Sequence, residues 1–156
     1  MPSSRPLLPA ERELLGCFAG AIDLDRVRVY GRRSAPGRVM SMFTGGKSIA
    51  LGYRLFLSRG SSLPVMAHEL MHVCQYESWG ALSYLARGAW NQLVLRLLLR
   101  KDVYRWEPDP GKAFTDYRME QQGQIVQDCF DVSSPRRVQA QHLSPYRPTQ
   151  VIPVPP

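Results

Sequence analysis

Length, composition and charge indicate a single domain and exclude several classes of protein. The chain has 156 residues, enough for one domain with a core, and 44% of them are hydrophobic and 21% charged. Lys and Arg outnumber Asp and Glu by 20 to 13, a net charge of +7, which suits acidic partners, although a solvated basic surface is the simpler explanation. The odd number of cysteines excludes a disulfide framework and leaves open only a pairing of Cys74 with Cys129.

The N-terminal segment is predicted to be a flexible leader. Residues 1–8 are rich in Pro and Ser and lack the apolar stretch of a secretory signal peptide. The most apolar stretch, residues 89–99, is interrupted by Asn91, Gln92 and Arg96 and is too short to span a bilayer. We therefore expect no membrane span and a protein made in the cytoplasm without a signal peptide.

The first half of the chain predicts one helix and a small sheet. A helix begins at Pro9 and ends near Gly20, and the alternation over residues 26–30 predicts a strand, followed by a loop over 32–37. Two β-prone runs, 39–43 and 48–57, are joined by a segment with a Gly-Gly pair, which predicts a hairpin. The second run can itself bend at Gly52.

The second half predicts three helices and a tail. Serines and Pro64 start a helix over 61–77, and a second helix over 81–101 is followed by a third over 117–131, capped by Thr115 or Asp116. Residues 133–156 are rich in Pro and are predicted to be extended or disordered. The second helix carries an apolar stripe that we assign to the core, with a membrane or partner groove as the alternative: Leu82, Leu85, Ala89, Leu93 and Leu97.

The sequence His68-Glu69-Leu70-Met71-His72 carries the chemistry. Two histidines four residues apart project from one face of a helix, which is the spacing at which their nitrogens can hold one Zn²⁺. A glutamate beside the first histidine can take a proton from an activated water and return it to a leaving group. The alternative is a surface helix with two unrelated histidines.

A catalytic zinc needs a third protein ligand, for which Glu120 is the candidate. It lies in the first turn of the third helix, with Gly123 one turn further on, where a glycine would let two helices approach closely. The alternatives are Asp116, Asp128 and His142, or a Glu120 that merely favours the helix N-terminus.

Three residues near the histidine motif or Glu120 have predicted roles of their own: Gln75, Asp116 and Tyr117. Gln75 and Ser78 occupy the positions where a metzincin would have glycine and histidine, which excludes that class. Gln75 lies on the metal face and is assigned, like Asp116, to the surroundings of the ligands or to substrate contact. Tyr117 is predicted to be catalytic, through a hydrogen bond to the oxyanion, and simple helix packing is the alternative for Tyr117 and Gln75.

The stretch from His68 to Tyr76 resembles the signature of a bacterial family known as Vgr-related proteins, akin to small gluzincin-like domains. Residues 21–29 and 117–130 agree as well, the latter through a Tyr-x-x-Glu pattern in the helix that supplies the third ligand. The resemblance implies a zincin-like fold, zinc bound by His68, His72 and Glu120, and Glu69 as the base. It also implies an association with type VI secretion, in which such domains act as toxins or cargo.

Together these features predict an α+β, zincin-like domain over residues 9–132. It would have a small antiparallel sheet packed on three to four helices, with the metal between the helix of the His-Glu-x-x-His motif and a later helix. We expect a zinc metallopeptidase that hydrolyses an amide bond in a protein or a peptidoglycan peptide, exported from the bacterial cytoplasm by type VI secretion as an effector toxin. Its partners would be an immunity protein or a secretion spike protein, with no nucleic acid. The alternative is a zinc-stabilised adaptor or cargo module without turnover.

Overall fold

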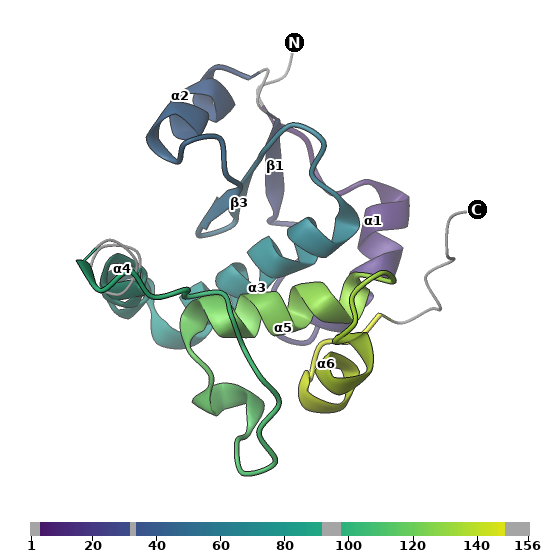
Figure 1. Cartoon of the computed structure of the whole chain (residues 1–156). Helices are drawn as coiled ribbons and strands as arrows, with labels where there is room; N and C mark the ends of the chain where they lie inside the picture. The colour runs from purple at the N-terminus through teal and green to yellow at the C-terminus, as the bar shows by residue number, and fades with distance from the viewer. Residues whose placement is uncertain (1–3, 32–33, 92–97, 149–156) are drawn as a thin grey trace.

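A computed structural model describes residues 4–31, 34–91 and 98–148. Within these ranges the chain forms a three-stranded sheet and six α-helices, which confirms the α+β class. Figure 1 shows α3 and α5 side by side at the centre, the strands and α2 on one side of α3, and α4 at the periphery. The elements are α1 (Pro9–Leu14), β1 (Arg28–Gly31), α2 (Ala35–Phe43), β2 (Ile49–Leu51), β3 (Arg54–Leu57), α3 (Leu63–Trp79), α4 (Ala81–Ala89), α5 (Met119–Phe130) and α6 (Arg137–Leu143), with 3₁₀ turns at Gly16–Phe18 and Phe114–Asp116.

The sheet is mixed, and the prediction of an antiparallel sheet is wrong. Its order is β1-β3-β2, with β3 parallel to β1 and antiparallel to β2. The chain between β1 and β3 contains α2 and β2, so it returns to the same end of the sheet before β3 begins. This order leaves β2 at the edge of the sheet, next to α3.

The predicted hairpin between residues 39–43 and 48–57 is wrong, because the observed hairpin lies entirely within residues 48–57. Residues 39–43 belong to α2, because Ser34 caps that helix by accepting a hydrogen bond from the Gly37 N–H at 3.1 Å, and proline occupies its first turn. The actual hairpin joins β2 to β3 through Gly52, which has φ 55°, and Tyr53. The predicted bend at Gly52 is therefore confirmed.

The N-terminal segment joins the fold from Arg5 onward. Arg5 forms an isolated β-bridge with Val29, its guanidinium pairs with Glu11, and Leu7 is buried. The prediction of a flexible leader is wrong for these residues, because backbone pairing and burial offset the entropy of ordering them. Residues 1–3 lie outside the described part of the chain.

The predicted tail is also partly wrong, because α6 packs against α5. Ala140 is completely buried, and the Tyr146 ring stacks on the core residue Phe18 with ring centroids 4.7 Å apart. The prolines that suggested disorder flank this helix rather than interrupt it. Residues 149–156 lie outside the described part of the chain.

The core lies where α3 meets the sheet on one side and α5 on the other. Leu55, Leu70 and Ile125 have no exposed surface. The three cysteines are free thiols, Cys74 and Cys129 buried and Cys17 half-buried. None of the helices in the described residues is long and apolar enough to cross a membrane.

Candidate metal centre

Helix α3 carries His68, Glu69 and His72 into the interior. Pro64 lies in its first turn, and it ends at Gly80, which has φ 77°. Residues 66–75 are all buried, because the sheet and α4 cover one part of the helix and α5 covers another. The helix therefore holds its two histidines within the protein and not on an exposed face.

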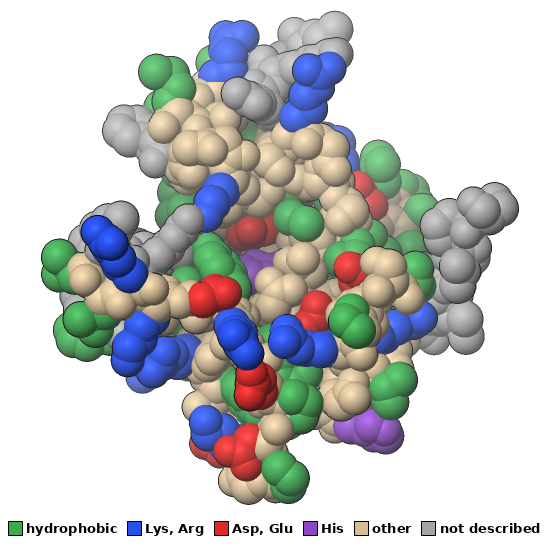
Figure 2. Space-filling view, in the orientation of Figure 1, with side chains coloured by type: hydrophobic (Ala, Val, Ile, Leu, Met, Phe, Trp, Pro, Cys, Tyr) green, Lys and Arg blue, Asp and Glu red, His purple; other side chains and the backbone are tan. Residues whose placement is uncertain are grey.

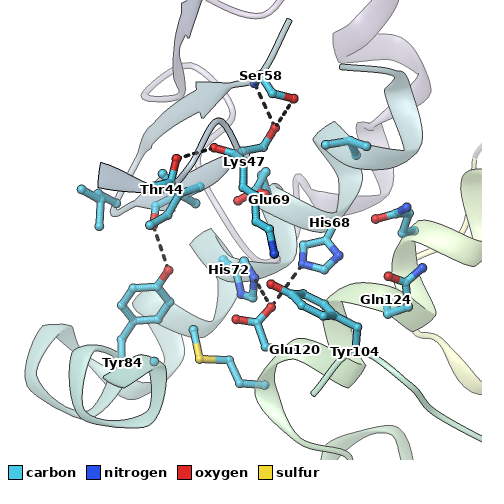
Figure 3. Close-up of a pocket in the computed structure, with 18 of the residues that line it drawn as sticks. Thr44, Lys47, Ser58, His68, Glu69, His72, Tyr84, Tyr104, Glu120 and Gln124 are labelled. Atoms are coloured by element: carbon cyan, nitrogen blue, oxygen red, sulfur yellow. Dashed lines mark hydrogen bonds and ion pairs between the residues drawn. The ribbon is translucent and has the colours of Figure 1, made fainter. Parts of the chain in front are cut away.

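The structure brings Glu120 to these two histidines. One oxygen of its carboxylate lies 3.5 Å from His68 Nε2 and 3.4 Å from His72 Nε2, and all three side chains are buried. Their candidate ligand atoms lie within 4.8 Å of one another. Figure 3 shows the three side chains converging, with Lys47 and Tyr104 beside them.

This geometry fits a tetrahedral zinc site. Bonds of about 2.0–2.1 Å to nitrogen and oxygen place neighbouring ligand atoms about 3.3 Å apart. The separations of 3.4 and 3.5 Å between Glu120 and the two histidine nitrogens are close to that value. Two imidazoles and one carboxylate are also the donor set of many catalytic zinc sites, which keep a fourth position open.

Gly123 permits the close approach of α3 and α5. A Cβ atom at this position would stand 2.8 Å from the His68 Cε1 and Nε2 atoms, well inside van der Waals contact. The prediction that this glycine brings two helices together is confirmed. Without it, Glu120 one turn earlier on α5 could not sit as close to the histidines.

Gln75 orients His72 from behind. Its Oε1 lies 2.7 Å from His72 Nδ1, so the imidazole donates there and leaves Nε2 facing Glu120. The Nε2 of Gln75 donates to the Met119 carbonyl at 3.0 Å and to Gln122 Oε1 at 2.9 Å, which connects α3 to the start of α5. Gln75 is thus placed around the ligands and has no contact with the cavity. In contrast, His68 Nδ1 is buried without a hydrogen-bond partner in the described residues.

Burial and mutual charge shift the pKa values of the cluster. Burial raises the pKa of Glu69, against the opposing effect of the two histidines, and an Ala50 backbone hydrogen bond also favours the carboxylate. Burial opposes the charge on Glu120, but hydrogen bonds to the two histidines outweigh it and lower its pKa. The same balance raises the pKa of His72: burial opposes its positive charge, and the hydrogen bond and charge of Glu120 outweigh that effect.

The cluster opens into a cavity of about 900 Å³. The cavity is lined by edge strand β2, by one side of α4 and by the start of α5. The backbone of Ala50, in the middle of β2, is hydrogen-bonded to Glu69, and its carbonyl accepts from the Tyr84 hydroxyl at 2.9 Å. The edge strand therefore fixes both the candidate base and the inner side of α4.

Two cavity residues were not found by sequence reasoning. The Tyr104 ring lies 6.2 Å from the His68 ring between centroids, and the Lys47 ammonium lies 5.7 Å from the Tyr104 ring. Both line the cavity. Neither stands at a fixed spacing from the histidine motif, so only the folded chain brings them to it.

Other predicted site residues lie elsewhere. The predicted position of Tyr117 beside the metal is wrong: it precedes α5, and its hydroxyl donates to the Glu107 carbonyl and accepts from the Asp109 N–H. Asp116 is exposed and accepts from the Ala113 N–H, because it closes a 3₁₀ turn and does not belong to α5. Asp128 accepts from the Trp106 indole at 2.7 Å, and His142 is exposed on α6.

Comparison with known proteins links the chain to a secretion machine. It is 41% identical over 123 residues to the type VI secretion system spike protein VgrG2b of Pseudomonas aeruginosa (strain PAO1), and the match covers 74% of this chain. The same match covers only 12% of the relative, so the chain spans about an eighth of its length. No family model and no solved structure matches the chain. The chain is therefore related in sequence to part of a type VI secretion spike protein.

Proposed function

We propose that the protein is a zinc-dependent peptidase that acts as a type VI secretion effector. One observation carries the enzymatic part: His68, His72 and Glu120 converge in a buried cluster, and Glu69 lines the same cavity. The similarity to the VgrG2b spike protein supports the link to secretion. The substrate is an amide bond in a protein or in the peptide stems of peptidoglycan.

Each residue has a separate task in this proposal. His68, His72 and Glu120 hold the zinc, which when bound polarises a carbonyl and lowers the pKa of a water molecule to about 7. Glu69 adjoins His68 on the helix and takes the proton from the attacking water, then delivers it to the leaving amine. The four side chains are buried at the inner end of the cavity, which limits their contact with bulk water and so strengthens these interactions.

Tyr104 takes the role that the sequence assigned to Tyr117. It lines the cavity beside His68, whereas the Tyr117 hydroxyl is engaged with the backbone of residues 107 and 109. A phenol at the Tyr104 position can donate a hydrogen bond to the oxyanion of a tetrahedral intermediate. Tyr104→Phe is expected to lower kcat by about 10²–10³-fold, while Tyr117→Phe leaves kcat within about threefold.

The decisive variant is Glu69→Gln, which keeps size and hydrogen bonding but removes the base. We expect it to retain zinc, measured by metal analysis, and to lose about 10²–10⁴-fold in hydrolysis of denatured protein or isolated peptidoglycan. Growth of bacteria that express each form in the periplasm gives an independent readout. Full activity in Glu69→Gln would refute the mechanism, and a zinc-loaded wild type with no activity in any assay would favour the cargo module.

A further inference from the structure

The prediction that the apolar stripe of the helix expected over 81–101 belongs to the core is wrong for Leu82, Leu85 and Ala89, which α4 exposes, and Leu93 and Leu97 lie outside the described residues. The exposed fractions are 85% for Leu82 and 55% for Leu85, and Trp90, directly after the helix, is 57% exposed. Leu98 and Leu99 are 75% and 54% exposed. Single exposed leucines are common on proteins, but a cluster within one segment indicates a binding surface.

The inner side of α4 packs against the rest of the protein, so the exposed leucines are not needed to hold the helix in place. Tyr84 is the one buried residue of α4, and its hydroxyl donates to the Ala50 carbonyl. Its ring meets Tyr76 edge-on, with centroids 5.7 Å apart. This contact fixes the helix through one face and leaves the opposite face toward solvent.

The segment that carries this face contains only positive charges, with Glu77 and Asp102 at its two ends. From Ser78 to Lys101 the sequence contains no Asp or Glu but four basic residues, of which Arg87, Arg100 and Lys101 lie in the described part and are exposed. Figure 2 shows hydrophobic and basic side chains gathered together over α4. Leucine and tryptophan with surrounding Arg and Lys are the composition of helices that lie on anionic membranes.

We propose that this surface docks the protein on an anionic lipid bilayer. We call it the α4 surface, and it comprises Leu82, Leu85, Arg87, Trp90, Leu98, Leu99, Arg100 and Lys101. A second copy of the chain is a poorer occupant, because a symmetric contact would bring the basic residues of both copies together. The leucines enter the interface of the bilayer, and the basic side chains meet its headgroups.

Docking at this surface would orient the cavity. Leu85, Gly88 and Ala89 belong to α4 and line the cavity. Docking through α4 would therefore bring the cavity mouth to the membrane surface. If the proposed peptidase function holds, its substrates are then peptide segments held close to a membrane. The docking itself does not depend on catalysis.

The test is co-sedimentation of the zinc-loaded, 156-residue chain with lipid vesicles. Vesicles with equal parts phosphatidylglycerol and phosphatidylcholine should bind it about tenfold or more tightly than phosphatidylcholine alone, because each basic residue near an anionic surface adds to the attraction. Added salt should weaken the binding. No binding, or equal binding to both vesicles, would overturn the proposal.

Matched variants locate the contact. Leu82→Asp should reduce vesicle binding about tenfold or more, and Val138→Asp, which changes another exposed apolar residue on α6, should not. The double variant Arg100→Gln, Lys101→Gln should also reduce it, whereas Arg59→Gln, Lys112→Gln, with the same change in net charge, should not.

Three further measurements complete the test. Thermal unfolding confirms that each variant is folded, which the exposure of these side chains leads us to expect. Equal loss in both members of a pair would overturn the proposal, as would a dimer in analytical ultracentrifugation that Leu82→Asp dissociates. Vesicle binding by the inactive Glu69→Gln form separates docking from the peptidase proposal.

Discussion

Helices α3 and α4 follow one another in the chain, and both carry apolar residues at helical spacing, yet the fold treats them differently. Residues 66–75 of α3 are all buried, whereas α4 buries Tyr84 alone. The sheet and α5 enclose α3, while α4 meets the rest of the protein through one side. An apolar stripe predicts a face that avoids water, and it does not tell whether the same chain supplies the cover.

The largest expected difference between the helices is in packing. Leu70→Ala on α3 should lower the free energy of unfolding by about 2–5 kcal/mol, because a leucine with no exposed surface leaves a cavity. Leu82→Ala on α4 should change it by less than about 0.5 kcal/mol, because that side chain is 85% exposed. Denaturant unfolding measures both. A large loss in Leu82→Ala would mean that the α4 surface is packed in solution.

A smaller effect is expected behind the metal cluster. Gln75→Ala leaves His72 Nδ1 without its partner and should weaken zinc binding about 10–100-fold, measured by competition with a chelator. Gln124→Ala is the matched control, because Gln124 also lines the cavity but its side-chain amide donates to Asp128 rather than accepting from His72. Equal affinity in both variants would show that the hydrogen bond does not orient His72.

The smallest expected effect compares two helical glycines. Gly123→Ala places a Cβ atom 2.8 Å from His68, and the strain should outweigh the gain in helix propensity, leaving a net loss of about 1–2 kcal/mol and weaker zinc binding. Gly88→Ala on α4 meets only the Met119 Cε at 4.0 Å and should stabilise the protein by up to about 1 kcal/mol. Thermal unfolding at fixed zinc concentration measures both. Similar shifts in the two variants would contradict the close approach of α3 and α5.

Local patterns predicted the parts of the site that lie on one helix. The spacing of His68 and His72 sets them on one face, Pro64 and Gly80 bound their helix, and the turn at Gly52 was recognised from its glycine. These features depend on backbone geometry within a few residues, which the sequence carries directly. Glu120 lies on another helix, so the sequence offers it only as a candidate, through Gly123 one turn further on.

Where neighbours from elsewhere in the chain decide the outcome, sequence reasoning failed. The sequence does not distinguish the roles of Tyr117 and Tyr104. In the structure the Tyr117 hydroxyl is hydrogen-bonded to the backbone of residues 107 and 109, whereas Tyr104 lines the cavity. The prolines of the C-terminal segment predict an extended or disordered tail, although α6 packs against α5 and the Tyr146 ring stacks on Phe18.

The sequence by itself determined the pair of histidines with Glu69 between them, the mixed α+β character and the helix that carries the motif. Only the tertiary structure decided that Glu120 reaches the histidines, that Gln75 orients one of them, and that the leucines of α4 remain uncovered. The physical reason is that helical periodicity fixes directions within one element. Burial, cavities and ion pairs depend on which elements come together, and those contacts join residues as far apart as His68 and Glu120.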